Sequence, residues 1–345
     1  MATPNVLFMN QREQTRKWFM RGPTLEKIDE LGWDIRYNES DEPLEEEEWA
    51  DLTEGAEVLL TTWGSPQLNE TVLGKNDTLK FVGHVGGSVA AYVTDYLYDL
   101  GVPVCTANPL MARTVAEATV MHMLMALKRA HKHVKLGTRS EPMEWYKDGD
   151  IRVPEDCVMG IWGYGHIAQW LVHYLKPFEP KDIIVVSGHM TDEGAAKEGF
   201  RLVEFDELFE QADCIFCLAG MTVANKGKVG AKQLQSMKDD AVIIQPGRAP
   251  LIQREPLYEE LKKERFMAVF DVYYQEPLPE DDPLNDMPNV ILNPHNAGSG
   301  RDDRYMKAML EEAERFFNGE KLQYEVSLSR AQEMTDMGAV RKSDK

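Results

Sequence analysis

The sequence has few cysteines, no excess of basic residues and no long uninterrupted apolar run. Four cysteines among 345 residues are too few for the disulfide framework of a secreted protein. Lysine and arginine number 38 against 58 acidic residues, and no basic face appears on which a nucleic acid would bind. No apolar run approaches the roughly eighteen residues needed to span a bilayer. The N-terminal segment also lacks the basic and apolar regions of a signal peptide. We therefore expect a cytoplasmic protein with neither a nucleic acid nor a membrane as partner.

The cysteines also bear on metal binding, because Cys214 and Cys217 form a C-x-x-C pair. A metal or redox site is one interpretation of this spacing. The other is a buried strand, in which positions three apart face opposite sides of the sheet. No second cysteine pair or nearby histidine completes a tetrahedral site. We favour two core cysteines and predict no metal site.

What the sequence does contain is an alternation of short apolar runs with amphipathic stretches, which predicts parallel α/β structure in two halves. The predicted strands of the first half cover residues 5–10, 34–38, 56–63, 79–85 and 102–108. Those of the second half cover residues 158–165, 182–188, 202–205, 214–220, 241–247, 267–273 and 290–295. Helices are predicted at 23–32, 113–134 and 302–322, the last with Gly319 as its stop.

Three further segments carry expectations of their own. Residues 113–134 show no helix breaker, so we expect one helix with Met121 and Met125 facing the core. Residues 137–156 are polar and predict a surface excursion, a candidate arm onto a partner subunit. Residues 327–345 are polar and predict a loosely docked tail.

A glycine-rich turn follows the strand predicted at 158–165. Gly163, Gly165 and Ala168 satisfy G-x-G-x-x-A between a predicted strand and a predicted helix. In such a turn the N–H groups of His166 and Ile167 point from the positive end of the helix towards a pyrophosphate. A tight turn without a ligand is the alternative, but the surrounding strand–helix–strand order favours a dinucleotide site.

Ser187 ends the next predicted strand, where an acid would usually bind the ribose hydroxyls of NAD. A serine does not repel the 2′-phosphate of NADP, and His189 lies close by in the sequence. We therefore favour NAD slightly and do not exclude NADP. Ala219, Gly247 and Gly298 follow later strands and complete the predicted cofactor set.

Three side chains at successive strand ends predict chemistry on a small acid. Arg248, Glu276 and His295 each follow a predicted strand, and α/β ligands bind at the carboxyl ends of the strands. Arg248 could bind and polarise a 2-oxo acid, and His295 could deliver a proton to its oxygen. Glu276 could accept from the other ring nitrogen and raise the pKa of the histidine. Singly, each residue is better explained as a surface ion pair or a loop residue, but their combination favours catalysis.

The glycine turn, residues 114–129 and the three strand-end segments together resemble the D-isomer-specific 2-hydroxyacid dehydrogenases. That family includes phosphoglycerate, D-lactate and glyoxylate or hydroxypyruvate enzymes, and formate dehydrogenase is a relative. The resemblance extends from the first predicted strand to about Leu322, and it implies that Arg248, Glu276 and His295 are the catalytic triad.

The resemblance also implies further site residues and a domain plan. Asp271 matches a carboxylate that holds the nicotinamide amide, and Thr114 a hydroxyl near the cofactor phosphates. Gly86 and Gly87 match the loop whose N–H groups receive the substrate carboxylate. The implied fold has two Rossmann-like doubly wound domains, with a nucleotide-binding domain (109–298) inserted in a discontinuous flavodoxin-like substrate domain (1–108 plus 299–345). A homodimer is implied as well.

Several positions depart from the family pattern. Gln245 and Ala249 replace common residues beside Arg248, and Asn296 stands where an apolar residue is common. The glycines of the carboxylate loop are adjacent rather than spaced, and no His-x-Pro follows the strand at 214–220. Because the triad is intact, we expect altered substrate choice. The glutamine expected of a formate dehydrogenase before its histidine is absent from "LNPHNAG".

Two functions remain in competition. The first is an NAD(P)-dependent oxidoreductase acting on a small anionic 2-oxo or 2-hydroxy acid. The second is a dinucleotide-sensing regulatory protein without significant turnover, a class represented by the C-terminal-binding corepressors, which resemble the same family. The intact triad favours the enzyme.

Overall fold

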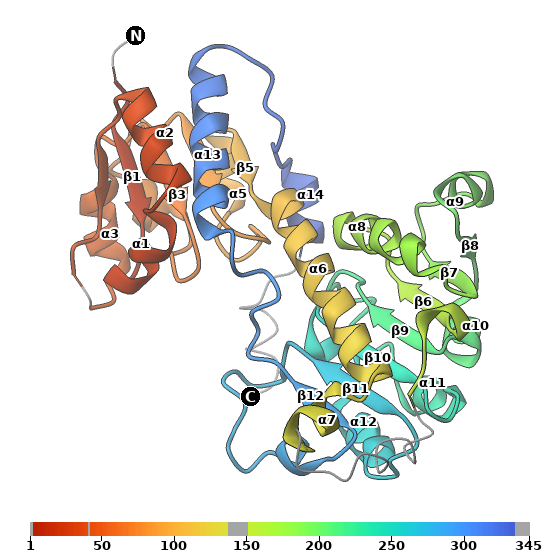
Figure 1. The fold of residues 1–345 in the computed structure, drawn as a ribbon. Helices are drawn as coiled ribbons and strands as arrows, with labels where there is room; N and C mark the ends of the chain where they lie inside the picture. Colours follow the sequence, from red (N-terminus) through yellow and green to blue (C-terminus); the bar gives the residue numbers. More distant parts are fainter. Residues whose placement is uncertain (1–2, 41, 137–150, 335–345) are drawn as a thin grey trace. The chain divides into compact units, whose positions relative to one another are not determined.

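The computed structural model of the chain describes residues 3–40, 42–136 and 151–334 (Figure 1). It divides into two compact units, which are described separately. The first unit comprises Met1–Met111 and Ser299–Lys345, and the second Ala112–Gly298. The part of the chain predicted as an arm lies largely outside the described residues. That one unit binds substrate and the other the cofactor stays a prediction.

The first unit is built on a five-stranded parallel sheet with the order β2-β1-β3-β4-β5. This is the flavodoxin-like order, which reverses between β1 and β3. Its strands are β1 (Val6–Met9), β2 (Ile35–Tyr37), β3 (Val58–Thr61), β4 (Phe81–His84) and β5 (Val104–Thr106). Its helices are α1 (Glu13–Phe19), α2 (Pro23–Leu31), α3 (Glu46–Thr53), α4 (Glu70–Leu73), α5 (Asp95–Asp99), α13 (Asp302–Phe317) and α14 (Leu328–Glu333).

Both faces of this sheet are covered, as the unbroken apolar character of its strands requires. Alternate residues of β1 enter different cores: Val6 and Phe8 pack with residues of α13, whereas Leu7 and Met9 pack with Trp49 of α3. The structure therefore places the C-terminal helix α13 against the N-terminal sheet, and the predicted discontinuous α/β fold is confirmed for this unit.

The second unit contains a seven-stranded parallel sheet with the order β12-β11-β10-β9-β6-β7-β8. Its strands are β6 (Val158–Trp162), β7 (Asp182–Val186), β8 (Arg201–Leu202), β9 (Cys214–Cys217), β10 (Val242–Gln245), β11 (Met267–Phe270) and β12 (Val290–Leu292). The helices in its part of the chain are α6 (Asn108–Leu127), α7 (Ala130–Leu136), α8 (His166–Leu175), α9 (Asp192–Glu198), α10 (Phe205–Gln211), α11 (Ala231–Ser236) and α12 (Arg254–Leu261). Short 3-10 turns are η2 (Pro154–Asp156), η3 (Lys176–Phe178), η4 (Ala249–Leu251) and η5 (Pro283–Asp286). The order reverses between β6 and β9, which confirms the predicted Rossmann-like arrangement.

The helix predicted at 113–134 differs from the observed structure. α6 begins at Asn108 and ends at Leu127, and α7 starts only at Ala130, because Arg129 adopts a left-handed φ of 49°. The inward direction of Met121 was also wrong, since this side chain is 46% exposed while Met123 is buried.

α6 also corrects the expectation that no run is apolar enough to span a membrane. Asn108–Leu127 passes that test by length and composition, with a mean hydropathy of 1.2. However, 56% of the tested window is buried within the protein, and Ala116, Met123 and Ala126 belong to the core beneath the second sheet. Its apolar character is therefore explained by packing against that core.

Two further predictions are corrected by local packing. The strand predicted at 202–205 ends at Leu202, because Glu204 forms a capping box and Phe205 starts α10. The segment after Ser327 is no loose tail as far as residue 334: it forms α14, capped by Ser327, with Ala331 buried in the core. Residues 335–345 lie outside the described residues.

The C-x-x-C pair lies in β9, as the buried-strand interpretation predicts. Cys214 and Cys217 are both fully buried free thiols. Burial raises the pKa of the Cys217 thiol to about 12, so it stays protonated.

Candidate active site

Three neighbouring strands of the second sheet end at one edge, and the residues predicted to be catalytic follow them. β10, β11 and β12 are adjacent and parallel (Figure 1). Arg248 follows β10, Glu276 follows β11 and His295 follows β12. Since parallel strands carry their carboxyl ends on the same side, all three segments leave the sheet at this edge.

His295 and Glu276 are in direct contact. Nδ1 of His295 lies 2.7 Å from Oε2 of Glu276, and the side chains are 38% and 17% exposed. The other carboxylate oxygen accepts the backbone N–H of Tyr273 at 3.1 Å. A carboxylate at Nδ1 favours the tautomer with its proton there, which leaves Nε2 as the nitrogen that can exchange a proton with a ligand.

The backbone around His295 is held on both sides. His295 has a φ of 52°, and its N–H donates to the Asn293 carbonyl at 3.0 Å. The Tyr273 hydroxyl donates to the same carbonyl. The Asp271 carboxylate, only 1% exposed, accepts the backbone N–H groups of the two residues after His295 at 3.1 and 3.0 Å.

Arg248 sits at the end of a turn that Gln245 closes. The fully buried Gln245 donates from Nε2 to the Arg248 carbonyl at 3.0 Å and accepts the Gly247 N–H at 3.2 Å. The half-buried Arg248 side chain donates from Nη1 to the Gly247 carbonyl at 2.8 Å. Gln245, one of the departures from the family pattern, therefore shapes the backbone that carries Arg248.

The glycine turn after β6 has the features that a pyrophosphate needs. Gly163 has a φ of 97°, and a Cβ there would lie 2.6 Å from backbone atoms of Ala219. Its N–H donates to the Val186 carbonyl at 2.9 Å, which ties the turn to the end of β7. Around a Cβ built on Gly165, by contrast, the space is open. Only glycine fits the first position, and the second leaves room for a ligand to approach the backbone.

The helix that follows presents its N-terminus at this turn. α8 starts at His166, so the first N–H groups, including that of Ile167, have no acceptor within the helix. Ala168 is fully buried in the core under the sheet. The small third residue thus permits close packing of helix and strand, and these residues fit a dinucleotide.

The remaining cofactor candidates lie on several elements of the second unit. Ser187 directly follows β7, and its hydroxyl accepts the His189 N–H at 3.3 Å. A Cβ on Gly247 would lie 2.9 Å from the Cys217 carbonyl, so this glycine passes close to the end of β9. The others are Ala219 after β9, the buried Thr114 on α6, and Gly298 at the end of the second unit.

The loop predicted to receive a carboxylate lies in the first unit. Gly86 and Gly87 follow β4, and the Thr106 hydroxyl is within hydrogen-bond distance of both their carbonyls, at 3.2 and 2.7 Å. A Cβ on Gly87 would lie 3.5 Å from the Met111 sulfur, which places Met111 beside the loop.

His84 lies directly beneath this loop. Its Nδ1 is 3.0 Å from the Thr61 hydroxyl, and its ring stacks on Tyr92 with centroids 4.6 Å apart. A Cβ on Gly86 would lie 2.6 Å from Nε2, so the imidazole occupies the space that a side chain would need. Burial lowers the pKa of His84 to about 3, and the ring is neutral at physiological pH.

Sequence reasoning missed two residues near the strand-end site. Tyr273, in "DVYYQEP", contacts both Glu276 and the turn of His295, but no periodicity indicates where its hydroxyl points. His122 on α6 is 1% exposed, and among the described residues neither ring nitrogen has a hydrogen-bond partner. Burial lowers the pKa of His122, and the nearby Asp271 carboxylate opposes that shift.

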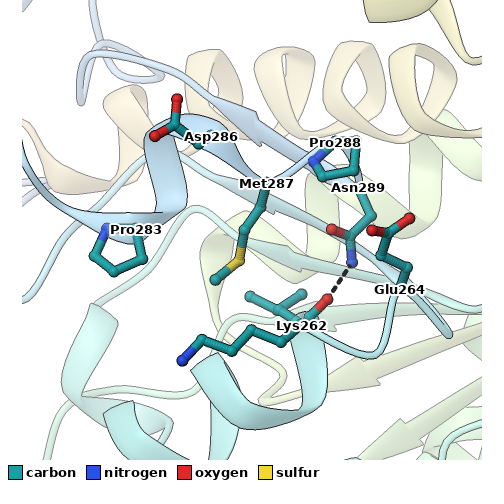
Figure 2. A pocket seen from close by; sticks show the side chains of 8 residues that line it. Lys262, Glu264, Pro283, Asp286, Met287, Pro288 and Asn289 are labelled. Carbon is teal, nitrogen blue, oxygen red and sulfur yellow. Dashed lines mark hydrogen bonds between the residues drawn. The ribbon is translucent and has the colours of Figure 1, made fainter.

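A hollow of about 320 Å³ lies elsewhere in the second unit, and Figure 2 shows the side chains that line it. Its residues precede β11 and β12, so it lies at the amino ends of these strands, on the opposite edge from His295. None of the predicted site residues lines it. The lining residues are Leu261, Lys262, Glu264, Pro283, Asp286, Met287, Pro288 and Asn289.

Several known proteins are similar to this chain. The model of the "D-isomer specific 2-hydroxyacid dehydrogenase, NAD binding domain" matches residues 117–297. The chain is 30% identical over 265 residues to a D-3-phosphoglycerate dehydrogenase of Methanocaldococcus jannaschii, covering 74% of this chain and 48% of that protein. It is 26% identical over 258 residues to a glyoxylate/hydroxypyruvate reductase B of Yersinia enterocolitica, covering 73% and 78%.

The fold is also that of a solved structure, the TT0316 protein from Thermus thermophilus. The TM-score is 0.77 at 19% identity, over 94% of this chain and all of that one. The family match extends over the glycine turn and all three strand-end segments. The chain belongs to the D-isomer-specific 2-hydroxyacid dehydrogenase family and contains its NAD-binding domain.

Proposed function

We propose that this chain, an NAD-dependent hydroxyacid oxidoreductase by its family, interconverts a small 2-oxo acid and the corresponding 2-hydroxy acid. In this proposal His295 is the acid–base catalyst, Glu276 its partner and Arg248 the cation that binds the substrate. The observation that carries it is the 2.7 Å contact between Nδ1 of His295 and Glu276, on the sheet edge where Arg248 also lies.

The proton chemistry belongs to His295. When bound, the nicotinamide supplies or accepts the hydride. In the reducing direction, Nε2 of His295 donates a proton to the substrate oxygen, and in the oxidising direction it takes the proton back. Glu276 fixes the ring through Nδ1 and stabilises the positive charge that the ring carries before it donates.

Arg248 supplies the local positive charge that an anionic substrate needs. The chain has a formal net charge of −20, so its overall field repels a carboxylate. The planar guanidinium can donate two parallel hydrogen bonds to a carboxylate, or one to the carbonyl oxygen that it polarises. The N–H groups of the Gly86–Gly87 loop are the proposed second binding group for the carboxylate.

The cofactor would be held by the turn after β6 and the strand ends beside it. Gly163 makes the tight turn, Gly165 leaves room for the pyrophosphate, and the first N–H groups of α8 would donate to it. Ser187 would face the adenosine ribose with a hydroxyl that binds either NAD or NADP, and Asp271 would contact the nicotinamide amide.

A panel of 2-oxo acids with NADH and with NADPH tests this function. We expect at least one small 2-oxo acid to oxidise NADH, followed by the loss of reduced-nicotinamide absorbance. Tight NADH binding without turnover of any acid would overturn the proposal and favour the dinucleotide-sensing alternative.

Arg248→Lys should raise KM for the acid, because lysine keeps the charge but loses the paired donors.

We also propose that the chain forms a homodimer, as its family resemblance implies. Light scattering at micromolar concentration should give about twice the chain mass of 39.3 kDa. A mass equal to that of one chain would refute this assembly without affecting the proposed chemistry.

A further inference from the structure

Tyr273 contacts Glu276 directly and is linked to His295 through the Asn293 carbonyl. Its backbone N–H donates to Oε1 of Glu276 at 3.1 Å, while Oε2 of the same carboxylate contacts His295. Its hydroxyl donates to the Asn293 carbonyl, which also accepts the backbone N–H of His295 at 3.0 Å. Tyr273 therefore holds both the Glu276 carboxylate and the Asn293 carbonyl that accepts the backbone N–H of His295.

Asp271 holds the same turn from its other end. One carboxylate oxygen accepts the Asn296 N–H at 3.1 Å, and the other accepts the Ala297 N–H at 3.0 Å. The Asp271 N–H donates to the Gln245 carbonyl at 3.1 Å, which anchors this residue at the ends of β10 and β11. With 1% of its surface exposed, Asp271 is a fixed part of the sheet edge.

The turn requires such support because of its conformation. His295 has a left-handed φ of 52°, a backbone conformation that is unfavourable for residues other than glycine. Pro294 restricts only its own φ, just before the turn, and the imidazole of His295 is 38% exposed rather than packed. The direction of the ring is therefore set by its contact with Glu276 together with the contacts to the peptide groups before and after it.

We propose that Tyr273 and Asp271 are positioning residues that hold the left-handed turn of His295, so that its ring faces the substrate with Nδ1 on Glu276. This inference rests on the proposed acid–base role of His295. It gives Asp271 a task besides any contact with the nicotinamide amide. Burial raises the pKa of Tyr273 to about 12, so its hydroxyl remains a donor throughout the working pH range.

Tyr273→Phe tests the proposal, and the neighbouring tyrosine provides a matched control. The Tyr274 hydroxyl also donates to a backbone carbonyl, that of Ile252 at 2.8 Å, but this acceptor lies outside the His295 turn. Each substitution removes one hydroxyl and keeps the ring. The measurements are kcat and KM for the 2-oxo acid, the NADH Kd from nicotinamide fluorescence, and the same set for Asp271→Asn.

We expect Tyr273→Phe to lower kcat about tenfold or more, since misplacing a catalytic group costs rate rather than affinity. KM and the NADH Kd should stay within about twofold, and Tyr274→Phe should change kcat by less than about twofold. Asp271→Asn, which loses an acceptor on one side, should lower kcat as well; because Asp271 is also a proposed contact of the nicotinamide amide, its NADH Kd is not used as a control. In a His295→Ala background, Tyr273→Phe should have no further effect, because it acts through the missing ring.

Other outcomes separate this inference from the proposed function. If His295→Ala is inactive but Tyr273→Phe matches Tyr274→Phe, the function stands and the positioning role is wrong. If Tyr273→Phe lowers the residual activity of His295→Ala by the same factor, it acts elsewhere and the inference also falls. If His295→Ala keeps full turnover, the proposed function itself fails. Should Tyr273→Phe not fold, a fall in kcat of Asp271→Asn that is absent in a His295→Ala background supports the positioning role. An unchanged kcat, or the same fall in the His295→Ala background, overturns it.

Discussion

Burial of His84 should make the stability of the first unit depend on pH. Replacing His84 with glutamine removes an imidazole that packs between Tyr92 and Gly86 and contacts the Thr61 hydroxyl. Burial lowers the pKa of this ring from the usual 6.5 to about 3, so the folded unit excludes the proton that the unfolded chain accepts. Because the folded pKa is the lower one, the contribution of His84 is complete above about pH 7 and is lost as the pH falls towards 3.

The magnitude follows from the two pKa values. At pH 5 the unfolded chain protonates His84 almost fully while the folded unit does not, which costs about 2 kcal/mol relative to pH 7. Carboxylates also begin to titrate near pH 5, but they do so equally in the wild type and in the variant. Only the difference between the two pH dependences is therefore assigned to His84, whatever the absolute stability of His84→Gln.

The test is urea unfolding at pH 7 and at pH 5. Hydrogen exchange of peptides that cover β3 and β4 follows the unfolding of the first unit separately from that of the second. The free energy of unfolding of the wild type should fall about 2 kcal/mol more than that of His84→Gln between these pH values. His189→Gln, which removes an exposed imidazole of the second unit, should keep the wild-type pH dependence. Equal pH dependences of wild type and His84→Gln would refute the buried neutral imidazole.

The remaining predictions concern the second unit. Gly163→Ala should lower the free energy of unfolding by about 2 kcal/mol or more and abolish measurable NADH binding, because the added Cβ would lie 2.6 Å from the Ala219 backbone. Gly188→Ala is the control and should leave both unchanged, because the space around a Cβ at Gly188 is open. Ser187→Asp should lower kcat/KM for NADPH about tenfold or more and leave that for NADH within about threefold, and equal losses for both cofactors would contradict the ribose assignment. Glu276→Gln should lower kcat about 10²-fold at unchanged NADH Kd, and a kcat near that of the wild type would remove Glu276 from the mechanism.

The fold was largely predictable from the sequence, because short runs such as "NVLFMN" and "CIFCLAG" are largely apolar at successive positions, which is typical of buried strands. The errors arose where a single residue or a contact distant in sequence decides the structure. Arg129 adopts a left-handed φ between α6 and α7 and so interrupts the predicted helix, although arginine is not a residue type that breaks helices. Ala331 is buried by the first unit, which no local pattern of the polar C-terminal segment indicates.

For the candidate site, the positions of the residues could be predicted from the sequence, but their contacts could not. The sequence alone shows that Arg248, Glu276 and His295 each follow a predicted strand, because this depends only on the order of residues along the chain. The contacts of Tyr273 and the closure of the Arg248 turn by Gln245 depend on side-chain direction, which a sequence does not contain. For the same reason, the identity of the acid depends on loops that pattern alone does not place.

The most direct test of the central claim compares wild type with His295→Ala. Turnover of the preferred 2-oxo acid and the NADH Kd are measured on the same preparations. The account predicts that turnover falls about 10²- to 10⁴-fold while the NADH Kd changes by less than about threefold. Turnover by His295→Ala at the wild-type rate would contradict it.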